Sequence, residues 1–176
     1  MPKLVMQDDC FAPYGKMEIK YKGPDPFSIY KKAHMIIRDI FEIEDKDVWE
    51  RDFRWDTTDD PRSFFVRIVA NRGFDFNSSV NAEFVFQGVQ PSDPAKEGWV
   101  TVGIYPRLNT KFELNTFFKQ LPIYMGFLRI YNFFFYNRVR RGYLKLCREY
   151  TQRCMQALRE LMKAQGMEDI MEHPIK

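Results

Sequence analysis

The chain has few of the residues on which most catalytic and metal sites depend. Its 176 residues include only two histidines, His34 and His173, and three cysteines. Neither histidine lies near a cysteine in the sequence, so no metal-ligand spacing is present. The serines have no histidine and acid at the spacing of a catalytic triad, and neither a P-loop nor a dinucleotide fingerprint occurs. We therefore expect no metal, no cofactor and no catalytic residues, and a function other than catalysis is favoured.

The cysteines are too sparse and too odd in number for a disulfide framework. They are Cys10, Cys147 and Cys154. The last two lie seven residues apart in a segment with helical periodicity, which puts them on one face and too far apart along the axis to pair. The sequence predicts free, buried thiols in a reducing compartment.

Long hydrophobic runs are also absent. Residues 1–9 contain no apolar stretch of the kind found in a secretory signal. Residues 121–136 are rich in aromatics, but they include Arg129 and Asn132 and are shorter than a transmembrane span. We therefore expect a cytoplasmic protein.

Aromatic residues, in contrast, are abundant, at 16% of the chain with seventeen phenylalanines. A large core, a ligand pocket or a partner surface would each use such bulk. The length fits one domain, and no internal repeat or linker divides it. We assign residues 1–15 to an N-terminal extension, 16–165 to a single domain and 166–176 to a C-terminal tail.

Alternating apolar and polar residues predict a series of strands around one early helix. The Asp25-Pro26 pair is a helix start, and apolar residues then recur at helical spacing through residues 26–42. We expect Pro106 to end one strand before a separate short strand begins. The predicted strands are residues 16–22, 48–55, 63–71, 80–88, 99–105 and 110–114, and a long helical region follows them.

This order of elements, with its aromatic-to-helix ending, resembles the helix-grip fold of the START-like (SRPBCC) superfamily. The resemblance covers about residues 16–165. It implies an α+β fold in which a curved antiparallel sheet of about six strands wraps around a long C-terminal helix. One or two short helices follow the first strand, and a hydrophobic cavity lies between sheet and helix. Only one of those helices is evident here, and the family's glycine-rich loop and cyclase signatures are missing.

The resemblance implies a cavity but neither its contents nor a reaction. The bulky inward residues and the aromatic entrance favour a non-enzymatic carrier of a hydrophobic or amphipathic, lipid-like small molecule. Residues 49–55 alternate so that Trp49, Arg51, Phe53 and Trp55 share a face that would line the cavity. There Arg51 would bind a charged head group, unless it reaches solvent or pairs with an acid. The rest of the expected lining is Phe64, Phe84, Phe86, Tyr131, Tyr143 and Tyr150.

The long helix has two opposite faces. Residues 129–163 hold nine basic and two acidic residues. At about 100° per residue, an apolar stripe comprises Val139, Tyr143, Leu146, Cys147, Tyr150, Cys154, Ala157 and Leu161. The opposite face is a basic band of Arg138, Arg141, Lys145, Arg148, Arg159 and Lys163.

The basic band indicates an anionic partner, and this is the alternative function. RNA binding, as in a ribosome-associated protein, is favoured over peripheral membrane contact, and no DNA is expected. A face that only meets solvent is the competing interpretation.

Seven of the thirteen residues 124–136 are aromatic. We predict that they pack in a local core or form a lid over the cavity mouth. Contact with lipid or a protein partner is the alternative, because one helix face cannot bury them all. Gly126 and Pro122 allow a bend, or a short separate helix, before the main one.

Overall fold

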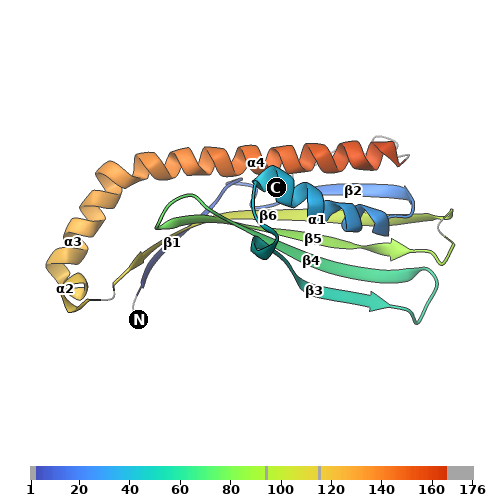
Figure 1. Cartoon of the computed structure of the whole chain (residues 1–176), viewed down its shortest axis with the longest axis horizontal. Helices are drawn as coiled ribbons and strands as arrows, with labels where there is room; N and C mark the ends of the chain where they lie inside the picture. Colours follow the sequence, from blue (N-terminus) through green and yellow to red (C-terminus); the bar gives the residue numbers. More distant parts are fainter. Residues whose placement is uncertain (1–2, 94, 115, 166–176) are drawn as a thin grey trace.

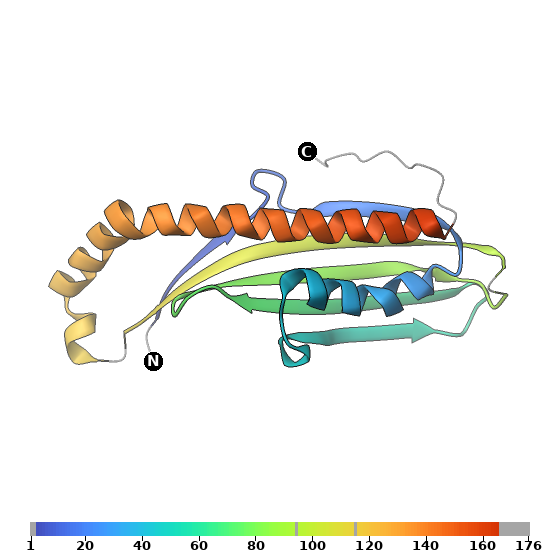
Figure 2. The same cartoon turned by 45° about the horizontal axis from the view of Figure 1, so that its top comes forward.

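Two long helices lie over one face of a six-stranded antiparallel sheet (Figures 1 and 2). This computed structural model describes residues 3–93, 95–114 and 116–165. The strands are β1 (Lys3–Asp9), β2 (Met17–Pro24), β3 (Val48–Asp56), β4 (Arg62–Gly73), β5 (Ser78–Gln90) and β6 (Glu97–Glu113). The helices are α1 (Phe27–Phe41), α2 (Phe117–Gln120), α3 (Pro122–Tyr131) and α4 (Asn137–Ala164), with a 3-10 turn η1 (Asp45–Asp47) and a π-helical turn η2 (Asn132–Tyr136).

These elements confirm the coarse fold prediction. The protein is α+β, its six strands are antiparallel, and the helical stretch from α3 to the end of α4 covers 43 residues. The predicted helix at 26–42 is α1, and η1 is a second, very short helix before β3.

The sheet has the order β1-β6-β5-β4-β3, and β2 pairs with β6 as well. Pairing with β2 ends at Ile104 and pairing with β1 begins at Arg107, so Pro106 lies at the junction of these two strands. We predicted that Pro106 would separate two strands, and this is wrong, because β6 runs unbroken through it. Proline has no N–H to donate to a neighbouring strand. At the junction between β2 and β1, β6 does not need a hydrogen bond from that position.

The first strand lies within the predicted N-terminal extension. Residues Lys3 to Asp9 pair in register with Glu113 to Arg107 of β6. These seven residues therefore belong to the sheet. The predicted C-terminal tail, with His173, lies outside the described residues.

The main core lies between the sheet and the two long helices. Ile29, Ala33, Ile37 and Phe41 recur every four residues and form the buried face of α1. From the sheet, alternate residues of β4, β5 and β6 point to the same layer and are fully buried: Val66, Ile68, Val80, Ala82, Phe84, Phe86, Val102 and Ile104.

The buried face of α4 is rotated from the predicted apolar stripe. Val139 and Leu146 belong to that stripe, yet both are exposed. The residues of α4 that are buried are Cys147, Thr151, Cys154, Met155, Leu158 and Met162. Because α4 packs against α1 as well as against the sheet, its covered face extends toward α1. Helical periodicity alone could not predict the contact between α4 and α1.

A β-bulge divides the predicted cavity face of β3. The register of β3 against β4 shifts just after Glu50. Beyond the shift, Phe53 and Trp55 lie on the helix side, with their rings 6.4 Å and 4.5 Å from that of Phe27. One extra residue reverses the alternation, so Trp49 lies on the opposite face. The prediction that the four alternating residues of this strand share one face is therefore wrong.

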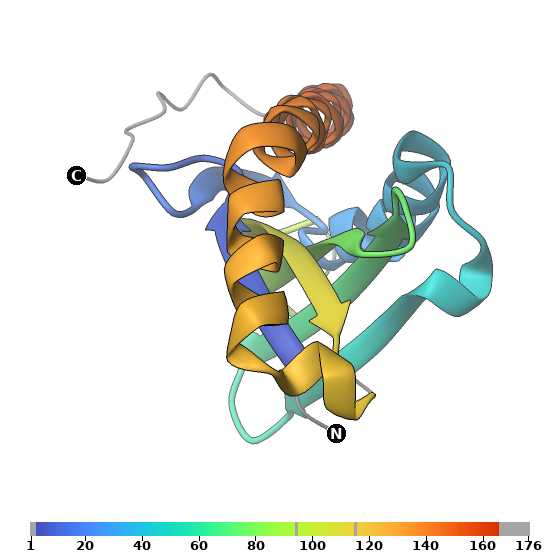
Figure 3. The same ribbon diagram turned by 90° about the vertical axis from the view of Figure 1, so that its left-hand side faces the viewer.

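The C-terminal helical stretch is bent. Figure 1 shows α3 turning away from the axis of α4 at the end of the sheet, and Figure 3 shows it in front of that end. The bend coincides with η2, where the Asn132 side-chain amide donates to the Leu128 carbonyl oxygen over 2.9 Å. Such π-helical turns are a usual cause of helix kinks. The predicted bend is thus present, but at η2 and not at Gly126.

Candidate functional site

The residues predicted to line a cavity fall in three separate places. Phe64, Phe84 and Phe86 are buried in the main core, and Trp55, Tyr143 and Tyr150 pack against it. The core rings touch, since the centroid of Phe41 lies 6.1 Å from that of Phe84 and 5.8 Å from that of Tyr150. Trp49, Arg51 and Phe53 are exposed on the edge strand β3, and Tyr131 is exposed on α3. Around Phe41, Phe84 and Tyr150, packed side chains therefore fill the space between the sheet and the helices.

The basic band lies mostly on the surface of α4. Five of its members are exposed, and Arg159 is half-buried. The guanidinium of Arg148 donates to the Cys10 carbonyl oxygen over 3.1 Å. In contrast, Arg138, Arg141 and Lys145 have no ion-pair partner within the part of the chain that the structure describes. These three cations lie at the end of α4 that adjoins η2.

We call residues 122–136, which comprise α3 and η2, the aromatic arm. Its large apolar side chains are mostly exposed, and Phe127, Phe133, Phe134 and Phe135 each expose between 67% and 70% of their surface. The full exposed set is Ile123, Tyr124, Phe127, Ile130, Tyr131, Phe133, Phe134 and Phe135. The prediction that this run packs in a core is therefore wrong for these residues. A helical segment that is apolar on most of its sides and still exposed marks an interaction surface.

The base of the arm is fixed to the sheet. Leu128 and Tyr136 are buried, and they pack with Phe112 in a small second core at the end of β6. Arg140, in the first turn of α4, forms an ion pair with Asp8 of β1: Nη2 donates to Oδ1 over 2.9 Å, and Nε lies 2.8 Å from Oδ2. The arm is thus anchored on its inner side while its outer side chains face away from the protein.

A chain of hydrogen bonds joins the arm to the hairpin between β4 and β5. Asp75 Oδ1 accepts the backbone N–H groups of Asn77 (2.8 Å) and Ser78 (2.6 Å), and Oδ2 accepts the Tyr136 hydroxyl (2.9 Å). Tyr136 thereby uses its single hydroxyl proton. The Ser78 hydroxyl, 2.6 Å from it, must then be the donor to Tyr136, and Thr110 donates to Ser78 over 3.0 Å.

The pKa values of Asp75 and Tyr136 follow from the contacts of the two side chains. Burial alone would raise the pKa of Asp75, but hydrogen bonds from Asn77, Ser78, Tyr136 and Tyr143 outweigh it and lower that pKa below its usual 3.8. Burial raises the pKa of Tyr136 to about 12, and the bond to Asp75 adds to the increase. At neutral pH the carboxylate is therefore ionised and the phenol neutral, which keeps the direction of each hydrogen bond fixed.

An open pocket of about 790 Å³ lies between the arm, the hairpin and the end of β6. Its lining comes from the hairpin tip, from β6, from Lys119 of α2 and from Tyr124 of α3. The hairpin contributes Asp75, Phe76, Asn77, Ser78 and Ser79, and β6 contributes Lys111, Phe112 and Glu113. We call this hollow the arm pocket.

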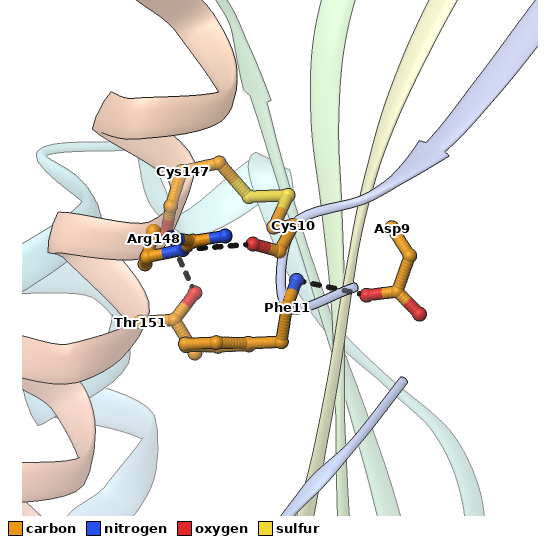
Figure 4. The surroundings of a disulfide bond; sticks show 6 residues. All are labelled: Asp9, Cys10, Phe11, Cys147, Arg148 and Thr151. Atoms are coloured by element: carbon orange, nitrogen blue, oxygen red, sulfur yellow. Dashed lines mark hydrogen bonds between the residues drawn. A yellow bond between two sulfur atoms is a disulfide. The ribbon is translucent and has the colours of Figure 1, made fainter. Parts of the chain in front are cut away.

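A disulfide joins the segment after β1 to α4 (Figure 4). Cys10 and Cys147 are 6.0 Å apart between Cα atoms and 137 residues apart in the chain. The prediction of free thiols is therefore wrong for this pair. It is confirmed for Cys154, which is free and buried, and burial raises the pKa of that thiol to about 12. Disulfides are rare in the cytoplasm of most organisms, so the bond is at odds with the expected reducing compartment, and the cytoplasmic location stays a prediction.

Contact through the arm was predicted from the sequence only as the alternative to core packing, although a further signal was present. Between Glu113 and Glu149 there is no acidic residue. The same interval holds seven basic residues, Lys119, Arg129, Arg138, Arg140, Arg141, Lys145 and Arg148. An acid-free, aromatic and cationic stretch is unusual for a helix that only covers a core. The arm pocket had no such signal, because Asp75, Thr110 and Tyr136 are far apart in the chain.

Two classes of site find no support in residues 3–93, 95–114 and 116–165. No three His, Cys, Asp or Glu side chains there are placed to share a metal ion. No helix there is both long and apolar enough to cross a bilayer. Comparisons with protein-family models, with curated proteins and with solved structures gave no match to this chain.

Proposed function

We propose that this protein is a non-enzymatic, peripheral binding protein that attaches to an anionic phospholipid surface through the aromatic arm. The observation that carries the proposal is the exposure of eight large apolar side chains on one short helical segment. Ile123, Phe127, Ile130 and Phe134 recur at spacings of four, three and four residues, so they form one continuous outer side. Leu128 and Tyr136 hold the opposite side against the sheet.

The length of the arm suits a helix that lies in the membrane–water interface and not one that crosses the bilayer. Fifteen residues of helix are about 22 Å long at 1.5 Å per residue, and the hydrocarbon core of a bilayer is about 30 Å thick. A helix of this kind lies in the headgroup region with its apolar side chains in the acyl boundary. Phenylalanine and tyrosine supply the apolar surface, and Tyr131 can keep its hydroxyl group among the polar headgroups.

Positive charge supports the choice of an anionic surface. Arg129 lies within the arm, and Arg138, Arg141 and Lys145 follow it, all four exposed. A lysine or arginine close to an anionic membrane contributes about 1 kcal/mol at physiological salt. Apolar insertion and electrostatic attraction thus act together, which is the usual requirement for stable peripheral attachment.

Other occupants fit the arm less well. A second copy of the chain would bring its Arg129 and the neighbouring Arg138, Arg141 and Lys145 of α4 against the same cations of the first copy, and like charges repel across an interface. An RNA would engage the phosphate-binding cations and could stack on phenylalanines, but Ile123 and Ile130 would gain nothing from it. RNA binding is therefore the second outcome of the test and not the favoured one.

The test is sedimentation of the protein with phosphatidylcholine vesicles that contain or lack phosphatidylglycerol. We expect binding to the anionic vesicles and a loss of at least about 100-fold in the Phe127→Ser/Phe134→Ser variant, because each buried phenylalanine contributes roughly 1.5–3 kcal/mol. Both side chains are exposed, so the fold should be unaffected. Met35→Ser, an exposed apolar change on α1, is the matched control.

A charge-reversal pair separates the two partners. Arg138→Glu/Arg141→Glu should weaken vesicle binding and make it less sensitive to salt, whereas Lys20→Glu/Lys32→Glu, exposed elsewhere, should not. If vesicles do not bind while RNA binds in a salt-dependent way that the arginine pair abolishes, the basic band is an RNA site. Binding that ignores both the phenylalanine and the arginine variants would contradict the proposal.

The helix-grip, START-like assignment and the carrier function attached to it also stay proposals. They are supported by the element order and by the layer that α1 and α4 form over one face of the sheet. The filled core at Phe84 and Phe86 favours a ligand elsewhere than between sheet and α4.

A further inference from the structure

The arm pocket is open beside the surface that we propose to meet a membrane. It lies on the inner side of the arm, where Tyr124 of α3 faces residues of the hairpin tip and of β6. Its volume of about 790 Å³ is within the range of about 300–1,000 Å³ that small-molecule sites occupy. A molecule leaving the headgroup region could therefore enter it without a large rearrangement.

The charges of the pocket are not balanced once their partners are considered. Both of its carboxylates are engaged: Asp75 accepts hydrogen bonds from the hairpin and from Tyr136, and Glu113 lies 3.2 Å from the ammonium group of Lys3. The two cations are Lys111 and Lys119. Within the described residues neither has an ion-pair partner. With Glu113 paired to Lys3, the two ammonium groups outweigh the ionised Asp75, and the pocket carries one net positive charge.

The remaining lining is divided between hydrogen-bonding and apolar groups. The side-chain amide of Asn77 and the Ser79 hydroxyl can donate to an anion; of Asn77, only the backbone N–H bonds to Asp75. Phe76, at the hairpin tip, is fully exposed, and Tyr124 exposes 38% of its surface. A ligand with a phosphate at one end and an apolar chain at the other would satisfy both parts.

The pocket floor is built in advance. The hydrogen bonds from Thr110 through Ser78 and Tyr136 to Asp75 hold the hairpin against η2. The N–H of Lys111 also donates to the Asn77 carbonyl oxygen over 2.7 Å, which sets the hairpin tip beside the start of the Lys111 side chain. A preformed site loses less conformational entropy when it binds.

We propose that the arm pocket binds the phosphate monoester headgroup of an anionic amphiphile. The ammonium groups of Lys111 and Lys119 contact the phosphate, whose second negative charge matches the second cation. Tyr124 and Phe76 contact the first carbons of the attached chain. The inference rests on the proposed membrane attachment for its source of ligand, and the same chemistry could come from a soluble phosphate monoester.

The membrane arm of the experiment compares phosphatidic acid with phosphatidylglycerol in phosphatidylcholine vesicles of equal zeta potential. We expect the wild type to prefer phosphatidic acid about tenfold, the effect of roughly one charge-assisted hydrogen bond. Lys111→Gln/Lys119→Gln should lose the preference and keep the binding to phosphatidylglycerol vesicles, because the aromatic arm is intact. Lys20→Gln/Lys32→Gln is the matched control and should keep both.

The soluble arm measures the binding of glycerol 3-phosphate by calorimetry and makes the two proposals separable. If no vesicle binds but glycerol 3-phosphate binds and the Lys111/Lys119 variant abolishes it, the attachment proposal fails and the pocket is a soluble phosphate site. Equal binding of the wild type to the two lipids, together with no binding of glycerol 3-phosphate, would overturn the pocket proposal. A preference for phosphatidic acid that survives in the variant would overturn it as well.

Discussion

At the scale of the residue, Asp75 connects two distant segments through the hydrogen bonds that its carboxylate accepts. Four donors converge on its carboxylate from the hairpin, from Tyr136 and from Tyr143. They link two segments that are 61 residues apart, so the group acts as a tie between the base of the arm and the hairpin. No motif around Asp75 announces this role, because the hydroxyl donors come from other parts of the chain.

Replacing Asp75 should change how stability depends on pH. Its folded pKa is below the usual 3.8, so its contribution is fully present above pH 3.8 and is lost as pH falls through the lower folded value. Asp75→Asn should lower the free energy of unfolding by about 1 kcal/mol at neutral pH, given partial exposure. The difference from wild type should vanish in acid.

Denaturant unfolding monitored by circular dichroism from neutral pH down to pH 2 measures this difference. Asp59→Asn, an exposed carboxylate in the β3–β4 turn, is the control and should track the wild type. A constant difference across the whole range would show that Asp75 does not act through its ionised form.

At the scale of the element, the long helix shows why a periodic pattern defines a face only loosely. Hydrophobic spacing correctly predicted a helix with a core side, but it placed Leu146 inside and did not include Leu158. The structure reverses both, with Leu146 exposed and Leu158 fully buried. Contact with α1 covers a neighbouring strip of α4 that the apolar stripe does not reveal.

A matched pair of substitutions tests the rotated face. Leu158→Ala should lower the free energy of unfolding by about 2–5 kcal/mol, because it leaves a cavity in the packed core. Leu146→Ala removes the same atoms from the surface and should cost less than about 1 kcal/mol. Thermal and denaturant unfolding measure both, and equal losses would mean that the face is as the sequence predicts.

At the scale of the whole molecule, the disulfide joins two segments that are 137 residues apart in the chain. It links the segment between β1 and β2 to the middle of α4, beside the Arg148 bond to the Cys10 carbonyl oxygen (Figure 4). The ion pair between Arg140 and Asp8 makes a second connection, between β1 and the start of α4. Together these contacts hold α4, and with it the arm, in a set position on the sheet.

Removing the covalent link should destabilise the folded state. We expect Cys10→Ser to lower the free energy of unfolding by about 2–5 kcal/mol, because the bond closes a long loop. Reductant should lower the free energy of unfolding of the wild type to that of the variant, and it should leave the free energy of unfolding of the variant unchanged. Titration of thiols in the denatured, unreduced wild type should find one group, Cys154; three groups would show that Cys10 and Cys147 are not bonded.

Local physics made part of this protein predictable. Alternation and helical spacing over short windows identified α1, the strands β2 to β5 and the C-terminal helix, because such patterns follow from which side of an element is buried. The basic band on α4 followed in the same way, whereas the antiparallel α+β class was implied by the resemblance that the order of these elements carries. The strand β1 was not predicted, since its seven residues are a strand only because they pair with the far end of β6.

The remainder depended on contacts between distant residues. The bulge after Glu50, the path of β6 through Pro106 and the bond between Cys10 and Cys147 each require a partner that lies elsewhere in the chain. The same holds for the aromatic arm. Its sequence determined that it would be apolar, aromatic and cationic, but whether such a helix is buried depends on how far the sheet extends beneath it. The tertiary structure ends the sheet short of α3, and so the arm faces outward (Figure 1).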